Sequence, residues 1–343
     1  MDMMKVLTRL AVAFGPSGAE SEVTSVIEEL ARDHVDEISR DTLGNLICHK
    51  KGDGPRVMFS AHADSIGLVV THIDEKGFVH VGALGGVGAK DVIYTPVRFQ
   101  NGVRGLVCKD GGADHDKLSV MDLRIDIGAA SEDEAKKLVQ IGDAAVYDAP
   151  TYPAAGRVVS PYLDDRISCL ILLMAMERLE KTDNDLYFVF SAQEEVGCRG
   201  AKTAAWAIDP DYGVAVDVTC ADDEPGSKHQ GSSVCGKGAA VKVMDRLTIC
   251  TPELVEKLMS LGKEKGIAVQ RDVLQVGGTD AGPIQATRAG VYVGGISIPC
   301  RYVHTPTEMV DLNDVQACVD LVAAFSACGL ERHRTAGQGG ECK

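Results

Sequence analysis

Two glutamates stand side by side in the stretch SAQEEVGCRG, residues 191 to 200. Glu194 and Glu195 follow an apolar run, residues 186 to 190, which predicts a buried strand that ends just before them. Because successive side chains of a strand point to opposite faces, two adjacent acids cannot both belong to one solvated stripe. In an α/β sheet, ligands bind where the strands end. One acid at this edge could therefore bind a metal ion while the other moves protons.

Four further motifs place acids or histidines at the ends of predicted strands or the starts of predicted helices. They are AHAD with His62 and Asp64, YLDDRI with Asp164 and Asp165, VDVT with Asp217, and YVHTPTE with His304 and Glu308. Taken singly, each motif has an ordinary interpretation: a core histidine, a helix N-cap, a strand-end cap or a loop residue. Together they predict a cluster of carboxylates that requires a cation, because burying an unpaired carboxylate costs several kcal/mol.

The donor types indicate which cations fit. Two histidines and three or more carboxylates, with no thiolate among them, suit zinc, cobalt or manganese. The carboxylates exceed what one tetrahedral zinc ion needs, which predicts two divalent ions sharing a bridging carboxylate and a water. His62, with Asp64 two residues later, is typical of a ligand held in place by a neighbouring carboxylate.

The elements that must position these motifs alternate between helix and strand patterns after Asp164. Helices are predicted at residues 166–181, 201–208, 251–266 and 312–330, and strands at residues 186–192, 212–218 and 291–298. Strands separated by helices predict an α/β fold with a mixed, parallel-rich sheet covered by helices on both faces. Near the start, Ser17 and Glu20 predict a capping box for a helix that runs to about His34.

Residues 67–155 show a different pattern, with short alternating strands joined by turns. This predicts a small β-rich domain inserted into an α/β domain formed by residues 1–66 and 156–333. The last residues, 334–343, predict a disordered tail.

Composition excludes several function classes. The net charge of the 343 residues is −15 and no basic run occurs, so nucleic acid and anionic membranes are not expected as partners. No apolar stretch is long enough to span a membrane, and no secretory signal is recognisable. The 11 cysteines include no C-x-x-C pair, which is typical of reduced core residues in a cytoplasmic protein.

The motifs occur in the order H-x-D, D-D-R, E-E-x-G, D-x-T and Y-x-H-x-P-x-E, with GPSG near the start, RIDIGA in the insertion and GGTDA near the end. In this order they resemble the M42 family of metallo-aminopeptidases over nearly the whole chain. The resemblance implies that Asp164 bridges two metal ions, that His62 and Asp217 complete one site, that Glu195 and His304 complete the other, and that Glu194 is the general base. We also expect Asp64, like Glu194, to be a catalytic residue.

The resemblance also implies an activity and an assembly. The expected reaction removes amino-terminal residues from peptides by means of a metal-bridged water that a glutamate activates. The expected fold is a zinc-peptidase-like domain with an inserted PDZ-like dimerisation domain, whose dimers assemble into a dodecamer. Ser65 stands where the family commonly has glutamate. Two other functions stay open: a metal-independent, cellulase-like glycosidase and a non-catalytic metal-binding assembly protein.

Overall fold

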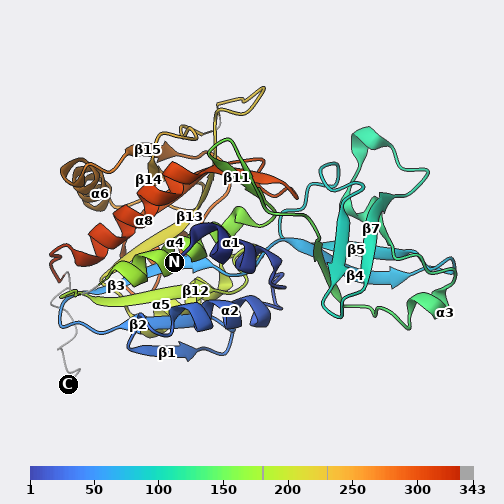
Figure 1. The fold of residues 1–343 in the computed structure, drawn as a ribbon, viewed down its shortest axis with the longest axis horizontal. Coiled ribbons are helices and arrows are strands. Elements are labelled where there is room, and N and C mark those ends of the chain that lie inside the picture. The colour runs from blue at the N-terminus through green and yellow to red at the C-terminus, as the bar shows by residue number, and fades with distance from the viewer. Residues whose placement is uncertain (180, 230, 333–343) are drawn as a thin grey trace, which may run out of the picture.

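The computed structural model describes residues 1–179, 181–229 and 231–332. Within these residues the chain forms a broad sheet packed between helices, and a smaller β-barrel projects from one end of this body (Figure 1). The predicted α/β fold with a β-rich insertion is confirmed. The predicted tail, residues 334–343, lies outside the described residues.

The main sheet is mixed and contains 11 strands within the described residues. Its strands are β1 (Glu37–Arg40), β2 (Leu46–Lys50), β3 (Arg56–His62), β10 (Tyr152–Ala154), β11 (Arg157–Ser160), β12 (Asp185–Ser191), β13 (Tyr212–Cys220), β14 (Ala239–Met244), β15 (Val269–Val273), β16 (Tyr292–Arg301) and β17 (Glu308–Asp311). Along the sheet the order is β1-β2-β12-β3-β13-β16-β17-β11-β10, while β14 and β15 branch from β16. The central neighbours β12, β3, β13 and β16 are parallel, so their carboxyl ends meet at one edge.

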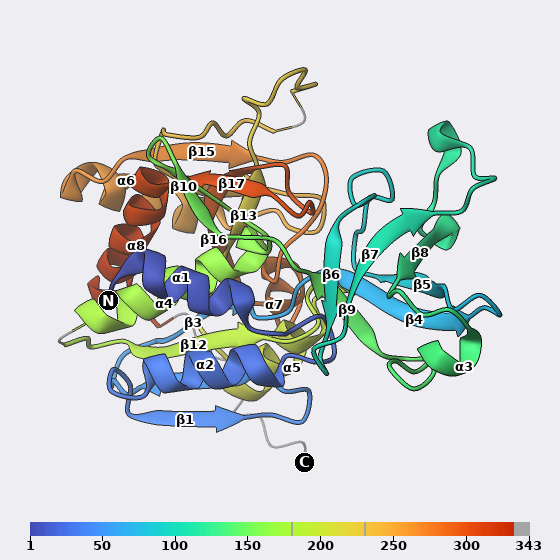
Figure 2. The same ribbon diagram turned by 45° about the vertical axis from the view of Figure 1, so that its right-hand side comes forward.

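Helices cover both faces of this sheet (Figure 2). They are α1 (Met3–Val12), α2 (Ser21–Ala31), α4 (Leu163–Arg178), α5 (Arg199–Ile208), α6 (Pro252–Lys265), α7 (Ala281–Gln285) and α8 (Leu312–Ala327). The helices α1, α4 and α8 share the larger core with one face, whereas α5 and α7 pack on β12, β13 and β16 from the other. Because both faces are buried, the central strands are apolar along nearly their whole length.

Local signals predicted some helix ends correctly and one incorrectly. Helix α6 begins after Thr251 and ends at Gly266, which adopts φ 67°, as expected. The capping box at Ser17 is wrong, because α2 begins four residues later and lacks a side-chain cap. Ser17 instead donates a hydrogen bond to Asp64, and Glu20 accepts from the backbone N–H of Gln193. Glu20 also accepts from the nearby backbone N–H of Gly18, so neither side chain makes the reciprocal bonds of a capping box.

The inserted unit is a closed barrel with the strand order β4-β5-β8-β7-β6-β9. Its elements are β4 (Gly67–Ile73), β5 (Val79–Leu84), β6 (Pro96–Phe99), β7 (Arg104–Lys109), η1 (His115–Lys117), η2 (Val120–Asp122), β8 (Leu123–Asp126), α3 (Glu132–Ala135) and β9 (Ala144–Tyr147). The barrel has a hydrophobic core distinct from the two cores around the sheet. Strand β10, which the sequence analysis assigned to the insertion, pairs with β11 in the main sheet.

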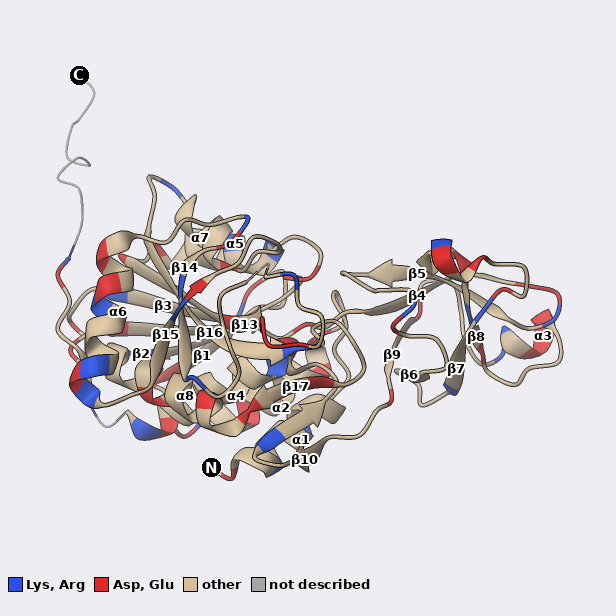
Figure 3. Ribbon diagram, turned by 90° about the horizontal axis from the view of Figure 1, so that it is seen from above, with Lys and Arg blue, Asp and Glu red and all other residues tan. Residues whose placement is uncertain are grey.

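Charged residues of both signs are spread along the ribbon of the body and the barrel, as Figure 3 shows from above. In the part of the chain that the structure describes, no helix has the length and apolar character needed to cross a membrane.

Candidate metal centre

The carboxyl ends of the central parallel strands bring the predicted site residues together. His62 is the last residue of β3, Glu194 and Glu195 follow β12, and Asp217 lies in the second half of β13. This convergence arises because parallel neighbours in register end at the same edge of the sheet. Asp164, near the start of α4, and His304, in the loop between β16 and β17, complete the cluster.

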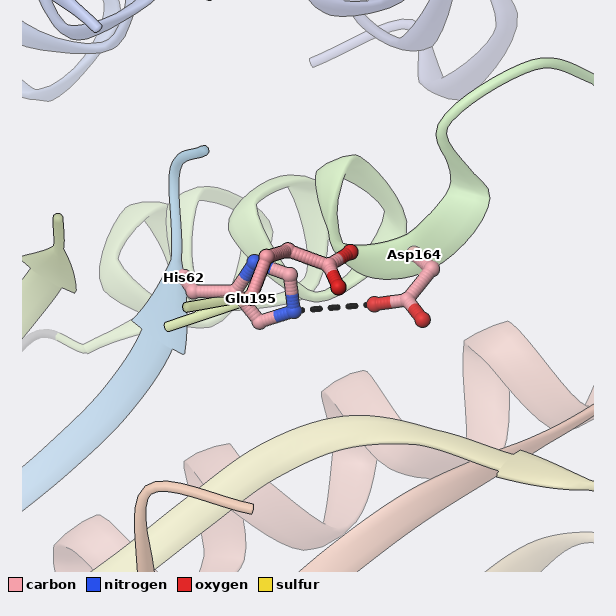
Figure 4. A group of neighbouring side chains, drawn as sticks. All are labelled: His62, Asp164 and Glu195. Atoms are coloured by element: carbon pink, nitrogen blue, oxygen red, sulfur yellow. Dashed lines mark hydrogen bonds and ion pairs between the residues drawn. The ribbon is translucent and has the colours of Figure 1, made fainter. Parts of the chain in front are cut away.

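Asp164 lies between the two histidines. Its Oδ1 is 2.8 Å from Nε2 of His62, and its Oδ2 is 3.2 Å from Nε2 of His304 (Figure 4 shows the first contact). Each oxygen of one carboxylate therefore faces a different imidazole. The Nε2 atom of His304 is also 3.2 Å from Oε2 of Glu195. On the other side, Nε2 of His62 lies 3.9 Å from Oδ1 of Asp217. The cluster thus divides into two groups that share Asp164.

Both imidazole rings are held through their Nδ1 atoms. Nδ1 of His62 lies 3.1 Å from the backbone oxygen of Asp64, and Nδ1 of His304 lies 3.0 Å from the backbone oxygen of Gly86. Because a carbonyl oxygen can only accept, each Nδ1 carries the hydrogen. The Nε2 atoms face the carboxylates, so each ring can offer Nε2 to a metal ion once that atom has lost its own proton. This is the tautomer and orientation that a metal-binding histidine requires.

The contact to His304 comes from the barrel side of the chain, because Gly86 follows strand β5. A Cβ atom added at Gly86 would lie 2.6 Å from Nδ1 of His304, so no larger residue fits while the ring keeps its place. Gly86 lies within residues 67–155, the segment predicted as the insertion. The barrel segment in fact supplies a contact that orients a residue of the centre.

Asp64 holds the two glutamates in place rather than joining the cluster directly. It is fully buried and accepts hydrogen bonds from the backbone N–H groups of Glu194, at 2.9 Å, and Glu195, at 3.3 Å. Ser17 donates a third hydrogen bond at 2.6 Å. Burial alone would raise the pKa of Asp64, but hydrogen bonds, first from His62, lower it. An ionised Asp64 therefore fixes the turn that carries both glutamates.

The acids and histidines of the cluster have pKa values that differ from their ordinary values. Burial, followed by the charges of neighbouring acids, raises the pKa of Glu194, Glu195 and Asp217. Burial also opposes ionisation of Asp164, but its hydrogen bonds to His304 and His62 lower its pKa overall. Burial acts to lower the pKa of His304, but its hydrogen bonds to Asp164 and Glu195 raise this pKa to about 12. Without cations, such a cluster must bind extra protons.

The donor atoms fit divalent cations. Within the described residues, Oε1 of Glu195 and Oδ1 of Asp165 are buried and have no hydrogen-bond donor. One potential ligand atom from each of His62, Asp164 and Glu195 falls within 4.8 Å of the others, and the same holds for His62, Asp165 and Asp217. Nitrogen lone pairs and carboxylate oxygens that face one another at this spacing repel unless a cation or a proton lies between them.

Several nearby residues had no role in the sequence analysis. Glu308 accepts the backbone N–H groups of both Asp164 and His304, at 2.9 and 2.8 Å, and so holds two of the predicted ligands. Asp165 accepts the backbone N–H of His62. Both acids belong to quoted motifs, and His304 lies only four residues from Glu308. Asp164 is 144 residues from Glu308 and His62 is 103 residues from Asp165, so spacing alone could not reveal these two contacts.

Three other residues lie as follows. Ser65 is buried and donates to the backbone oxygen of Gly15. Asp280, the aspartate of the GGTDA motif, is buried and accepts from Ser60 and Ser191. His115 is exposed on the barrel.

Comparison with known proteins gives consistent matches. The family described as M42 glutamyl aminopeptidase matches residues 44–321. The lysyl aminopeptidase of Pyrococcus furiosus is 35% identical over 94% of this chain and 96% of its own length. The solved aminopeptidase APDkam598 of Desulfurococcus kamchatkensis has a TM-score of 0.90 and 37% identity, covering 95% of this chain and 94% of that chain.

A further solved structure is informative about assembly. It is the TET1 peptidase of Pyrococcus horikoshii, which is described as able to assemble into a tetrahedron or a large octahedral shell. Its TM-score is 0.86 at 30% identity, with 95% of this chain and 99% of that chain covered.

Proposed function

This chain belongs to the M42 glutamyl aminopeptidase family, and we propose that it is a dinuclear metal-dependent enzyme that hydrolyses amino-terminal residues from peptides. The observation that carries the dinuclear proposal is the position of Asp164, whose two oxygens face the Nε2 atoms of two different histidines. A carboxylate in this position can bind two cations at once, one through each oxygen.

The proposed ligands follow from the two halves of the cluster. His62, Asp164 and Asp217 would hold one ion, and Asp164, Glu195 and His304 would hold the other. Zinc and cobalt, with manganese as a third choice, match this mixture of imidazole nitrogen and carboxylate oxygen. When bound, two such ions supply Lewis acidity and lower the pKa of a shared water towards neutrality.

Glu194 is the proposed general base. Its Oε2 lies 4.0 Å from Nε2 of His62, whereas Oδ1 of Asp164 lies 2.8 Å from the same nitrogen. Glu194 is therefore at the edge of the cluster. The backbone N–H of Glu194 is fixed by Asp64, so the carboxylate is held at the edge of the cluster. In the proposed reaction, Glu194 accepts the proton of the attacking water and then donates it to the leaving amine.

We also propose dimers that assemble into a dodecamer, and a cytoplasmic location. A dodecamer is recorded for PhTET1-12s, and the related TET1 peptidase forms a tetrahedron. Exposed apolar side chains on the barrel, Tyr94, Met121 and Ile141, support contacts between copies through this domain. The 10 cysteines of the described residues are all free, which agrees with a reducing compartment.

The experiment that tests this proposal combines metal removal with one substitution. Hydrolysis of an aminoacyl-p-nitroanilide panel should stop with a chelator and return with cobalt or zinc. Glu194→Gln should retain the wild-type metal content but lose about 100-fold or more in kcat, because only the proton acceptor has changed. Glu75→Gln, an exposed control, should behave as wild type. Near-normal turnover of Glu194→Gln would remove Glu194 from the proposed role.

The same assay separates the other two functions. A glycosidase that uses two carboxyl groups needs no metal, so its activity on a cellulose fragment should survive chelation. A non-catalytic assembly protein should bind metal but hydrolyse neither substrate.

A further inference from the structure

The second carboxylate oxygen of Glu194, Oε1, meets a cysteine. The backbone N–H of Cys198 donates to the carbonyl oxygen of Glu194 at 2.8 Å, closing a tight turn before α5. This turn places Sγ of Cys198 3.0 Å from Oε1 of Glu194. Cys198 is only 5% exposed. The two oxygens of Glu194 therefore have different surroundings, since Oε2 faces the proposed metal centre and Oε1 faces a thiol.

A second carboxylate points into the same space. Asp280 is 2% exposed, and its Oδ2 accepts hydrogen bonds from Ser60 at 2.7 Å and Ser191 at 2.5 Å. Its Oδ1 has no hydrogen-bond donor among the described residues. One potential ligand atom each from Glu194, Cys198 and Asp280 lies within 4.8 Å of the other two. The serines thus hold Asp280 with one buried oxygen free beside the thiol.

We propose that Glu194, Cys198 and Asp280 form a third cation site, distinct from the two-ion centre, which takes a thiophilic divalent ion such as Zn²⁺ or Cd²⁺ and thereby inhibits the enzyme. The inhibitory consequence rests on the proposed role of Glu194, whereas binding of the ion does not. One sulfur and two carboxylates supply three protein ligands and leave one position of a tetrahedral site for water.

The donor set selects the kind of ion. On binding, the S–H bond of Cys198 breaks, its proton passes to solvent, and the sulfur electron pair forms the bond to the cation. A thiolate favours zinc and cadmium over magnesium or manganese, which prefer oxygen ligands. We therefore expect the third site to be occupied only when a thiophilic ion is present in excess of the amount that fills the two-ion centre.

The local charge favours a further cation. Several buried or nearly buried acids surround the proposed centre: Asp64, Asp164, Asp165, Glu194, Glu195, Asp217, Asp280 and Glu308. When all are ionised, these carboxylates carry more negative charge than two divalent ions neutralise. The nearby cation Lys242 is paired with Asp272 at 2.5 Å and is therefore already compensated. A third divalent ion beside Asp280 would reduce this excess.

Occupation of the site would disable the base. An ion bound at Oε1 withdraws electron density from the Glu194 carboxylate and fixes its orientation, so the carboxylate accepts a proton less readily. Because the ion binds Oε1 of Glu194 and none of the ligands proposed for the two-ion centre, we expect kcat to fall more than KM rises.

The test is a cadmium titration of the zinc-loaded enzyme, followed by rate and by the ultraviolet charge-transfer absorption of a cadmium–thiolate bond. In the wild type, cadmium should add to the bound zinc without displacing it, the absorption should appear, and the rate should fall. In Cys198→Ser the absorption should be lost, and the cadmium concentration needed for half-inhibition should rise about tenfold or more. Inhibition is scored against each variant's own uninhibited rate.

Two further variants serve as a control and as an independent test of the proposed site. Cys220→Ser, which removes a partly buried thiol three residues beyond Asp217 on the same strand, should leave both readouts unchanged. Asp280→Asn keeps the thiol and should weaken cadmium binding, which tests the site if Cys198→Ser does not fold. Unchanged cadmium inhibition and absorption in Cys198→Ser, or in folded Asp280→Asn, would overturn the inference. If no peptidase activity exists but the Cys198-dependent absorption appears, the proposed function fails and the cation site stands.

Discussion

A single methyl group added at Gly86 should displace the imidazole ring of His304 and so weaken metal binding at the proposed centre. The Cβ of Gly86→Ala would lie 2.6 Å from Nδ1 and 2.9 Å from Cε1 of His304, whereas ordinary van der Waals contact begins at 3.4 Å. The ring must therefore move by about 0.8 Å, a gap that follows from these distances. Gly86 does not adopt the left-handed backbone conformation, so alanine itself is compatible with the local backbone.

The expected loss can be scaled from the contacts of the ring. His304 donates through Nδ1 to the backbone oxygen of Gly86 at 3.0 Å, and its Nε2 lies 3.2 Å from Asp164 and Glu195. Zinc–nitrogen bonds are about 2.0–2.1 Å and tolerate deviations of only about 0.2 Å, so a shift of the ring weakens binding. Disturbing such an orienting partner typically costs about 10–100-fold in metal affinity, or about 1.4–2.7 kcal/mol.

Metal affinity is measured by competition with a chromophoric chelator, together with kcat/KM. Gly111→Ala is the matched control, because a Cβ atom there meets nothing within 4 Å and the position also lies in the inserted segment. His304→Ala should cause a defect at least as large. Adding Gly86→Ala to His304→Ala should then cause little further loss, since both changes act on one ring. Wild-type metal affinity in Gly86→Ala would refute the reasoning, and so would full additivity in the double variant.

Two further predictions concern stability. Lys242 and Asp272 form a buried ion pair with side chains 1% and 0% exposed, so Lys242→Met should lower the free energy of unfolding by about 3–5 kcal/mol by leaving an unpaired carboxylate. Urea denaturation measures this, and Lys242→Met combined with Asp272→Leu should recover most of the loss; a single variant as stable as wild type would contradict the prediction. In the second case, hydrogen bonds from Arg301 lower the pKa of Asp223, so the folded state binds this proton at lower pH than the unfolded state. The pair therefore stabilises the fold above about pH 4, and this contribution disappears as the pH falls through the lowered pKa. The urea midpoint of Arg301→Gln should accordingly lie below that of the wild type at pH 7, and the two should converge in acid, whereas Arg271→Gln, from an exposed pair, should show little difference at any pH. A gap for Arg301→Gln that persists unchanged below pH 3 would exclude this explanation.

Much of the fold follows from patterns that act over short distances. Buried apolar runs followed by polar residues marked strands β3, β12 and β13, and Thr251 with Gly266 marked the ends of α6. Such signals are readable because each depends on neighbouring residues alone. The capping box at Ser17 shows their limit. Asp64, 47 residues away, binds the serine hydroxyl that would otherwise cap the helix.

The candidate site was likewise predictable from the sequence only in part. The motifs that hold His62, Asp164, Glu195, Asp217 and His304 could be found from the sequence because metal-binding side chains are restricted to a few residue types, and parallel strands bring their ends to one edge. The resemblance to the M42 family then selected these five residues as the proposed ligands. The direction of each ring could not be predicted, because it depends on the backbone oxygens of Asp64 and Gly86. A backbone carbonyl is the same for every residue type and therefore leaves no mark in the sequence.

The sequence by itself determined which motifs carry candidate donors and that these motifs end predicted strands or begin predicted helices. Only the tertiary structure decided that Asp164 lies between two imidazoles, that the barrel segment at Gly86 holds His304, and that Asp280 faces the Cys198 thiol across Glu194. These contacts join segments far apart in the chain. Their geometry depends on how whole layers pack, a property that no local spacing of residues encodes.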